Sequence, residues 1–130
     1  MFLHPMMSIG ADSILPAHPE GTPPPSAYGC FPRFIGHYSR ELGLLSLEEA
    51  IRRITSLPAS RYKLKNRGII KNEAYADLVI FDPEKINENF TPDGKPNISI
   101  GIDHVFINGK QIVENGIFKP GILPGKVLRM

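Results

Sequence analysis

Near its start the chain reads Met7-Ser8-Ile9-Gly10-Ala11-Asp12-Ser13, where a short apolar run ends in small residues and one carboxylate follows directly. Buried parallel strands read as continuous apolar runs, whereas half-exposed strands alternate apolar and polar residues. We therefore predict a buried strand over residues 1–9, ending in a loop at Asp12. In barrels of alternating strands and helices, the loops after the strands carry the chemistry. Asp12 is thus a candidate catalytic residue, and a carboxylate that only caps the following turn is the alternative.

The overall composition excludes several classes of protein. With 130 residues the chain has room for one domain or for parts of two. A formal net charge of +2, with Lys and Arg scattered, does not indicate a nucleic-acid partner. No apolar run approaches the roughly 18 residues of a membrane span, and the first residues do not resemble a signal peptide. The single cysteine, Cys30, suits a reducing compartment, so we expect a cytoplasmic protein.

A proline-rich segment follows Asp12 and separates it from two expected helices. Five prolines in residues 14–26 exclude a helix or a central strand there, which predicts a long loop. Apolar residues at 34, 38 and 42 predict a helix over residues 33–42, which ends at Gly43.

A second helix is predicted to begin after Ser46, which forms a capping box with Glu49. Its apolar face is expected to pack inward against the strand of residues 1–9, and Pro58 is expected to end it. The opposite face is expected to be solvated, with ion pairs four residues apart. The apolar face comprises Leu47, Ala50, Ile51 and Ile54, and the pairs are Glu48 with Arg52 and Glu49 with Arg53.

The remainder of the chain is rich in short predicted strands. Asn108-Gly109 is the strongest hairpin signal, because both central residues of a type I′ turn need a positive φ. Residues 67–82 and 102–113 are expected to form one antiparallel sheet around this turn, and residues 84–100 to form an excursion of turns. The predicted strands are residues 68–70, 76–81, 102–107, 111–113 and, at an edge, 126–128. The chain thus divides into residues 1–62 and residues 63–130.

No complete metal site or nucleophile motif can be found in the sequence. The four histidines form no H-x-H or H-E-x-x-H pair, and neither a phosphate loop nor a G-x-S-x-G elbow occurs. We expect the His4 side chain to pack within the protein, and His37 to be a surface or packing residue and not a metal ligand. We assign no role to His104. His18 alone is placed to reach a substrate. Cys30 is expected to pack as a small apolar residue.

Taken in order, several segments resemble the D-aminoacylases of the amidohydrolase superfamily, and the resemblance spans nearly the whole chain. Two segments are similar to that branch in particular: Gly29-Cys30-Phe31-Pro32-Arg33-Phe34-Ile35-Gly36-His37-Tyr38 and Thr55-Ser56-Leu57-Pro58-Ala59. Others are shared more widely in the superfamily. These are Ala76-Asp77-Leu78-Val79-Ile80-Phe81-Asp82-Pro83 and Ile107-Asn108-Gly109.

The resemblance implies a fold of class α/β plus β: residues 1–62 as the last strand and helices of a metal-dependent (β/α)8 barrel, and residues 63–130 as part of a small β-sandwich. It also implies a zinc-dependent hydrolase acting on a small-molecule amide. Asp12 would lie at the metal, taking a proton from the attacking water and returning it to the leaving amine. The other metal ligands belong to earlier strands, so the chain resembles a C-terminal portion that needs the N-terminal half as partner and is inactive alone.

The missing metal ligands and one further departure from the family pattern leave alternatives open. D-aminoacylases have a His-Pro-Arg whose arginine binds the substrate carboxylate, and at that arginine's position this chain has Ser26. The substrate-binding residues are therefore unassigned, and the substrate is an N-acyl-(D-)amino acid or a related amide. The alternatives are a fragment of a cyclic amidase of the dihydroorotase or hydantoinase type and a non-catalytic β-rich interaction module.

Overall fold

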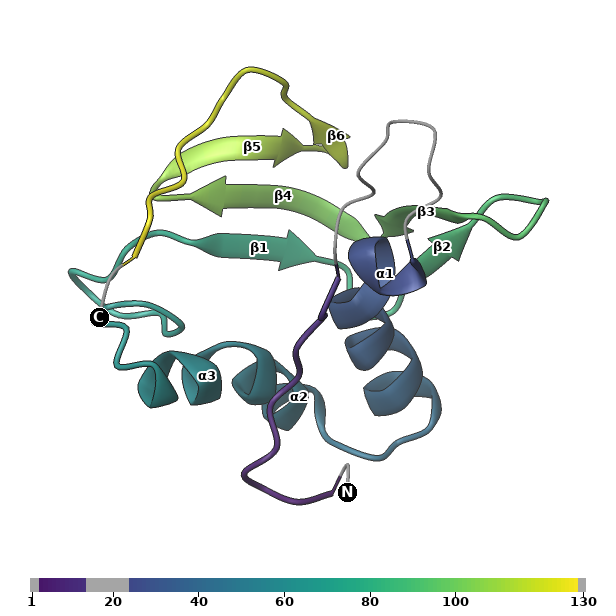
Figure 1. Cartoon of the computed structure of the whole chain (residues 1–130), viewed down its shortest axis with the longest axis horizontal. Helices are drawn as coiled ribbons and strands as arrows, with labels where there is room; N and C mark the ends of the chain where they lie inside the picture. Colours follow the sequence, from purple (N-terminus) through teal and green to yellow (C-terminus); the bar gives the residue numbers. More distant parts are fainter. Residues whose placement is uncertain (1–2, 14–23, 129–130) are drawn as a thin grey trace.

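The computed structural model describes residues 3–13 and 24–128, which form a group of helices beside a four-stranded sheet and a separate hairpin (Figure 1). The buried apolar residues lie mainly in the helices and include Phe34, Ile35, Ala50 and Leu57, with Ile86 joining them from the segment before β2. No helix in the described part of the chain is long and apolar enough to cross a membrane.

The first helical unit starts earlier than predicted. Helix α1 (Pro25–Arg33) continues directly into the π-helix η1 (Phe34–Glu41). The prediction that the proline loop reaches residue 26 is wrong, because proline fits the first position of a helix, where its missing N–H is not needed. The unit ends as predicted, with Gly43 in the left-handed region at φ +60°.

The start of helix α2 (Leu47–Ile54) confirms half of the predicted capping box. The Ser46 hydroxyl accepts a hydrogen bond from the Glu49 amide at 3.3 Å. The Glu49 carboxylate does not complete the box but accepts from Nε of Arg52 and Nε of Arg53, both at 2.7 Å. The predicted ion pair between Glu48 and Arg52 is not observed, because Arg52 pairs with Glu49 instead.

The prediction of a solvated charged face on α2 is wrong for Arg53, which is only 2% exposed. Ala50 is fully buried and lies one turn before Arg53, so both residues are on the side of α2 that contacts η1 and α3. Leu47, which was expected to face inward, is exposed instead. The ion pair with Glu49 offsets part of the cost of burying this arginine.

The cluster of Glu49 with Arg52 and Arg53 predicts a specific acid sensitivity. Hydrogen bonds from the two guanidinium groups lower the pKa of Glu49 from 4.5 to about 2. A carboxyl group with a lowered folded-state pKa adds stability above its unfolded pKa, and that stability is lost as the pH falls. We expect Glu49→Gln to unfold at lower denaturant than wild type at pH 7, and the difference to shrink between pH 4.5 and about 2. Denaturant titrations across this range test it, and the matched control is Glu84→Gln, at an exposed carboxylate that forms no ion pair with the described residues.

Pro58 does not end a helix, contrary to prediction. Helix α2 ends at Ile54, and a second short helix, α3 (Ser56–Arg61), contains Pro58 in its first turn. The first backbone N–H groups of a helix have no partner within it, so proline costs little there.

The main sheet agrees closely with the sequence-based prediction. Strands β1 (Leu78–Phe81), β4 (Ile102–Ile107), β5 (Lys110–Glu114) and β6 (Ile117–Phe118) form an antiparallel sheet in the order β1-β4-β5-β6. The β4–β5 turn is Asn108-Gly109, with φ +48° and +79°, as predicted. The Asn108 side chain accepts from Arg67 at 2.7 Å and donates to the Pro124 carbonyl at 2.8 Å, which ties the turn to two other segments.

Three predictions about strands are wrong. Residues 68–70 and 126–128 are not strands, and neither segment pairs with a strand among the described residues. The excursion at 84–100 contains a hairpin of β2 (Asn87–Phe90) and β3 (Pro96–Ile100). Its polar strand sequences gave no strand signal, and the hairpin packs on α1.

The predicted strand over residues 1–9 is also not observed in the part that the structure describes, residues 3–9. A strand needs a hydrogen-bonded neighbour, and no described segment lies beside this one as a strand. Instead, Arg52 donates to the Pro5 carbonyl at 2.8 Å, and Arg61 donates to the Met6 carbonyl and to the Ser8 hydroxyl. These contacts attach the segment to helices α2 and α3, and its purple trace in Figure 1 crosses α2 on the way toward α1.

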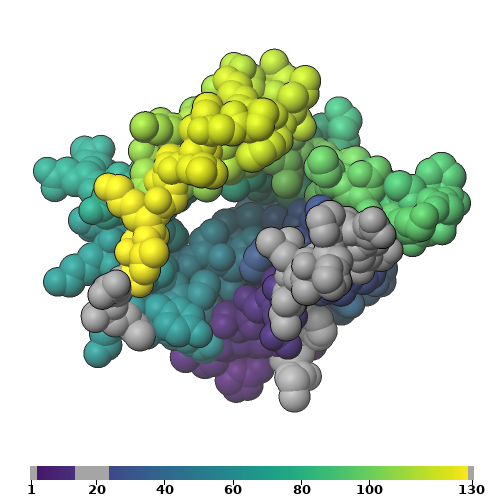
Figure 2. Space-filling view, turned by 45° about the horizontal axis from the view of Figure 1, so that its top comes forward, coloured from purple at the N-terminus to yellow at the C-terminus, as the bar shows by residue number. Residues whose placement is uncertain are grey.

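The main sheet leaves many apolar side chains exposed, among them Val79, Ile80, Ile117 and Phe118. Figure 2 shows an opening between the yellow C-terminal segment and the helices, so the helices do not cover the sheet there.

Two glycines bring the first helical unit close to the segment at β2. A Cβ atom on Gly36 would lie 2.2 Å from the Ile86 carbonyl oxygen, and one on Gly29 would lie 2.6 Å from the Glu88 Cβ. Such distances exclude any side chain unless the hairpin moves away. These two positions therefore fix how closely α1 and η1 pack against the hairpin.

We expect Gly36→Ala to lower the free energy of unfolding by about 1–3 kcal/mol, as overpacking does. The helix propensity of alanine favours the variant by roughly 1 kcal/mol, but a backbone oxygen at 2.2 Å cannot turn away as a flexible side chain could. Gly125→Ala is the control, because a Cβ there meets nothing within 4 Å. Chemical denaturation of both variants measures the effect, and equal stabilities would contradict this packing.

Candidate functional site

Asp12 follows two small residues and has a backbone conformation uncommon for a residue with a side chain. Its φ is +46°, in the left-handed region, which aspartate tolerates better than most residues. The residue is exposed, and its carboxylate makes no hydrogen bond or ion pair with the described residues. The carboxylate is therefore accessible to a substrate or a water molecule.

The segment that carries Asp12 is joined to helix α1 by two side-chain contacts. The hydroxyl of Ser13 lies 2.8 Å from the hydroxyl of Ser26, at the start of α1. One turn further, the thiol of Cys30 faces the Gly10 carbonyl oxygen at 3.9 Å. Asp12 is thus held next to the N-terminal half of α1.

A cleft of about 390 Å³ lies between this segment, the first helical unit and β2, and we call it the α1 cleft. Its apolar lining comes from Ile9, Pro25, Phe34, Tyr38 and Phe90. Ser26 and Cys30 also line it, so the two contacts with the Asp12 segment are at its wall. The cleft therefore begins close to Asp12.

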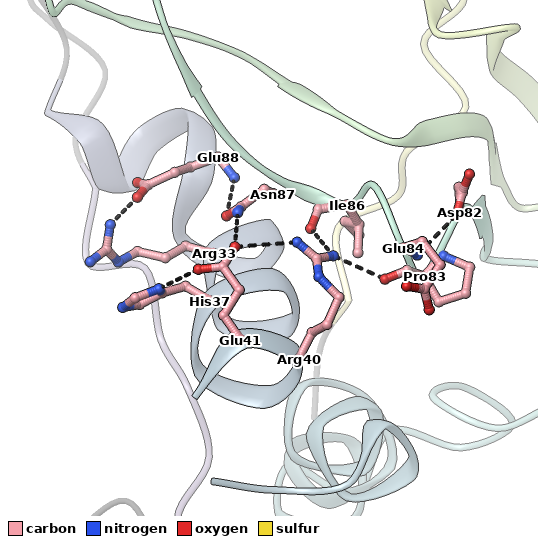
Figure 3. Close-up of polar contacts among 10 residues, drawn as sticks. All are labelled: Arg33, His37, Arg40, Glu41, Asp82, Pro83, Glu84, Ile86, Asn87 and Glu88. Atoms are coloured by element: carbon pink, nitrogen blue, oxygen red, sulfur yellow. Dashed lines mark hydrogen bonds and ion pairs between the residues drawn. The ribbon is translucent and has the colours of Figure 1, made fainter. Parts of the chain in front are cut away.

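The charged groups in the wall of the α1 cleft neutralise each other. Arg33 forms an ion pair with Glu88 of β2, and its guanidinium also lies 5.6 Å from the centre of the Tyr38 ring. Figure 3 shows this pair beside the contacts that hold η1 to the same segment. There Arg40 donates to the carbonyls of Pro83 and Ile86, both at 2.9 Å. The sequence resemblance contained Arg33 and Tyr38, but nothing in it predicted their contact with Glu88.

The three described histidines contact residues other than Asp12. His4 is exposed, so the prediction that it packs is wrong; its Nδ1 accepts from the Met6 amide at 3.2 Å. His37 is partly exposed and lies 2.8 Å from Glu41, which agrees with a surface position. That hydrogen bond is the main reason that the pKa of Glu41 is lowered. His104 contacts Gln111 at 3.0 Å, and His18 lies outside the described residues.

Cys30 is partly buried, as expected of a small apolar residue, and burial raises the pKa of its thiol. Within residues 3–13 and 24–128, no three His, Cys, Asp or Glu side chains are placed to hold a metal ion. Asp12 therefore does not form a metal centre with the other described residues.

The sequence pattern of the amidohydrolase family matches residues 20–113, and the chain belongs to that family. Within the family, its relatives are deacylases of D-amino acids. The chain is 37% identical over 131 residues to the N-acyl-D-glutamate deacylase of Alcaligenes xylosoxydans xylosoxydans, covering 99% of this chain and 25% of that protein. It is 38% identical over 120 residues to the D-aminoacylase of the same organism, covering 92% of this chain and 24% of that one.

Solved structures agree with these relatives. A crystal structure of D-aminoacylase matches with a TM-score of 0.78 and 38% identity over 87% of this chain and 23% of that one. The N-acyl-D-glutamate deacylase of Bordetella bronchiseptica matches with a TM-score of 0.77 and 37% identity over 85% of this chain and 23% of that one. That structure holds zinc and a phosphonate that mimics the tetrahedral intermediate, and another D-aminoacylase structure concerns a binuclear metal centre. The chain spans about a quarter of the length of the curated relatives it matches.

Proposed function

We propose that this chain supplies the catalytic carboxylate, Asp12, of a zinc-dependent amidohydrolase that hydrolyses the amide bond of N-acyl-(D-)amino acids or of a related amide. The observation that carries the proposal is the placement of Asp12: exposed, without a bonding partner among the described residues, and beside a cleft. The similarity to D-amino-acid deacylases supports amide hydrolysis as the reaction.

Asp12 would act as the base and then the acid of the hydrolysis. It would accept a proton from the attacking water and return it to the leaving amine, a role that a carboxylate can perform when it is accessible and correctly oriented. The described residues do not form a metal site by themselves. The ligands of the zinc are therefore proposed to come from the N-terminal half of the enzyme.

We further propose that residues 1–62 belong to the end of a (β/α)8 barrel and residues 63–130 to a small β-sandwich. Residues 3–9 have no partner strand among the described residues, and this supports the proposal, since a barrel would provide neighbouring strands on both sides. The exposed apolar side chains of the main sheet support it too, because a second sheet would cover them.

The substrate class depends on Ser26. Its hydroxyl is hydrogen-bonded to Ser13 and carries no charge. It therefore cannot bind a carboxylate through two charged hydrogen bonds, as the guanidinium group of an arginine does. This observation favours a related amide without a carboxylate at that point over an N-acyl-D-amino acid.

A substrate panel tests the proposal on the complete enzyme loaded with zinc. It pairs N-acetyl-D-amino acids with their L forms, with the corresponding N-acetyl amino acid amides, and with dihydroorotate and hydantoin. Hydrolysis of the linear amides supports the proposal, and preference for the uncharged amides supports the role of Ser26. Hydrolysis of the cyclic compounds alone, or of none, contradicts it.

A further inference from the structure

The α1 cleft has the size and position of a binding site for part of a small molecule. Its volume of about 390 Å³ lies within the range of about 300–1,000 Å³ that is common for such sites. One wall is the segment that carries Asp12, through Ile9 and the Ser13–Ser26 contact. A molecule that reacts at Asp12 can therefore extend into this cleft.

The lining of the cleft favours an uncharged group. Arg33 and Glu88 neutralise each other, and the Ser26 hydroxyl is bonded to Ser13. Burial raises the pKa of the Cys30 thiol, which keeps it neutral at ordinary pH. Phe34, Tyr38 and Phe90 supply aromatic surface. A charged group placed there would lose its hydration without gaining an unpaired partner, which is costly.

We propose that the α1 cleft binds the uncharged acyl chain of the substrate, with Phe90 in its lining. This inference rests on the proposed amide hydrolysis at Asp12. A linear N-acyl amide has two arms, and in the substrates proposed above the amine arm carries a polar group, either a carboxylate or a second amide, whereas the acyl arm is apolar. The acyl arm is the one that matches an apolar, electrically neutral cleft.

Cys30 provides a direct reporter of occupancy, because it lines the cleft and is the single cysteine of the chain. The rate at which N-ethylmaleimide modifies Cys30 is measured by peptide mass spectrometry in the presence of one of three compounds. These are N-acetylglycinamide, N-octanoylglycinamide, and an octanoyl analogue whose acyl chain ends in a carboxylate. We expect the octanoyl compound to slow the modification of Cys30 at least about fivefold, and the other two compounds to change its rate less than about twofold. The acetyl group is too short to fill the cleft, and the carboxylate-ended chain would bury a charge without a partner.

Two matched variants locate the effect. Phe90→Asp adds a charge to the cleft and should abolish the protection, whereas Phe118→Asp, at another exposed phenylalanine on β6, should retain it. A double variant, Cys30→Ser with Lys110→Cys, moves the single thiol to β5, away from the cleft. Protection of that relocated thiol by the octanoyl compound would reveal unspecific masking and contradict the proposal. Circular dichroism checks that each variant keeps its fold.

The assay needs neither metal nor turnover, so its outcome is independent of the proposed function. No protection by the octanoyl compound, or equal protection by the carboxylate-ended analogue, overturns the acyl cleft and leaves hydrolysis at Asp12 untouched. The same measurement on the complete enzyme completes the test. If Cys30 of the complete enzyme does not react even without a ligand, another part of the enzyme fills the cleft. That result also overturns the proposal.

Discussion

Replacing Asp12 by asparagine in the complete enzyme is expected to lower kcat by about 10²–10⁴-fold, the usual contribution of a general base. Asparagine has nearly the same shape and also tolerates the left-handed backbone at φ +46°, so the loop should keep its conformation. The amide cannot accept the proton of the attacking water. The loss therefore reports the chemistry of the carboxylate and not a change of fold.

Zinc content and a matched control make this test specific. Metal analysis should find the zinc content of Asp12→Asn nearly unchanged, because most of the ligands are proposed to come from the rest of the enzyme. Asp103→Asn removes another exposed carboxylate, on β4, and should leave kcat unchanged. If Asp12→Asn keeps kcat within a few-fold of wild type, Asp12 is not the base.

The 130-residue chain alone is expected to hydrolyse N-acyl amino acids no faster than background, even with added zinc. A catalytic zinc normally takes three protein ligands, and the described residues bring no three suitable side chains together. Without the metal, water keeps its ordinary acidity, and a carboxylate is too weak a base to ionise it.

Amide hydrolysis by the purified chain, with and without the co-expressed remainder of the enzyme, measures this effect. Metal-dependent turnover should appear only when the two parts are present together. Turnover by the chain alone that disappears with a chelator would place the complete site within these 130 residues, contrary to our assignment.

Local signals in the sequence predicted the parts of the fold that depend on a few neighbouring residues. Gly43 ends a helix and Asn108-Gly109 forms a hairpin turn, because both need a positive φ that few residues adopt easily. Ser46 caps α2 through a hydrogen bond to an amide three residues away. Strand β4 has the predicted bounds, since its run of apolar and β-branched residues lies between clear turn signals.

Features set by distant contacts were missed or predicted wrongly. Arg53 was expected in solvent because its charge pattern is that of a helix surface, and only packing on η1 and α3 buries it. The β2–β3 hairpin has polar strands, and its place depends on Gly29 and Gly36, which are far from it in sequence. Residues 3–9 have the sequence of a buried strand, yet they form no strand where no neighbouring strand lies beside them.

The sequence by itself therefore determined the turns, the main sheet, the family resemblance and Asp12 as the candidate base, because each depends on residue types at short spacing. The tertiary structure alone decided that Ser13 meets Ser26, that Arg33 is neutralised by Glu88, and that a cleft opens beside Asp12. The physical reason is that these contacts join residues 13 and 55 positions apart, and the path of the backbone between them follows from the packing of the whole chain.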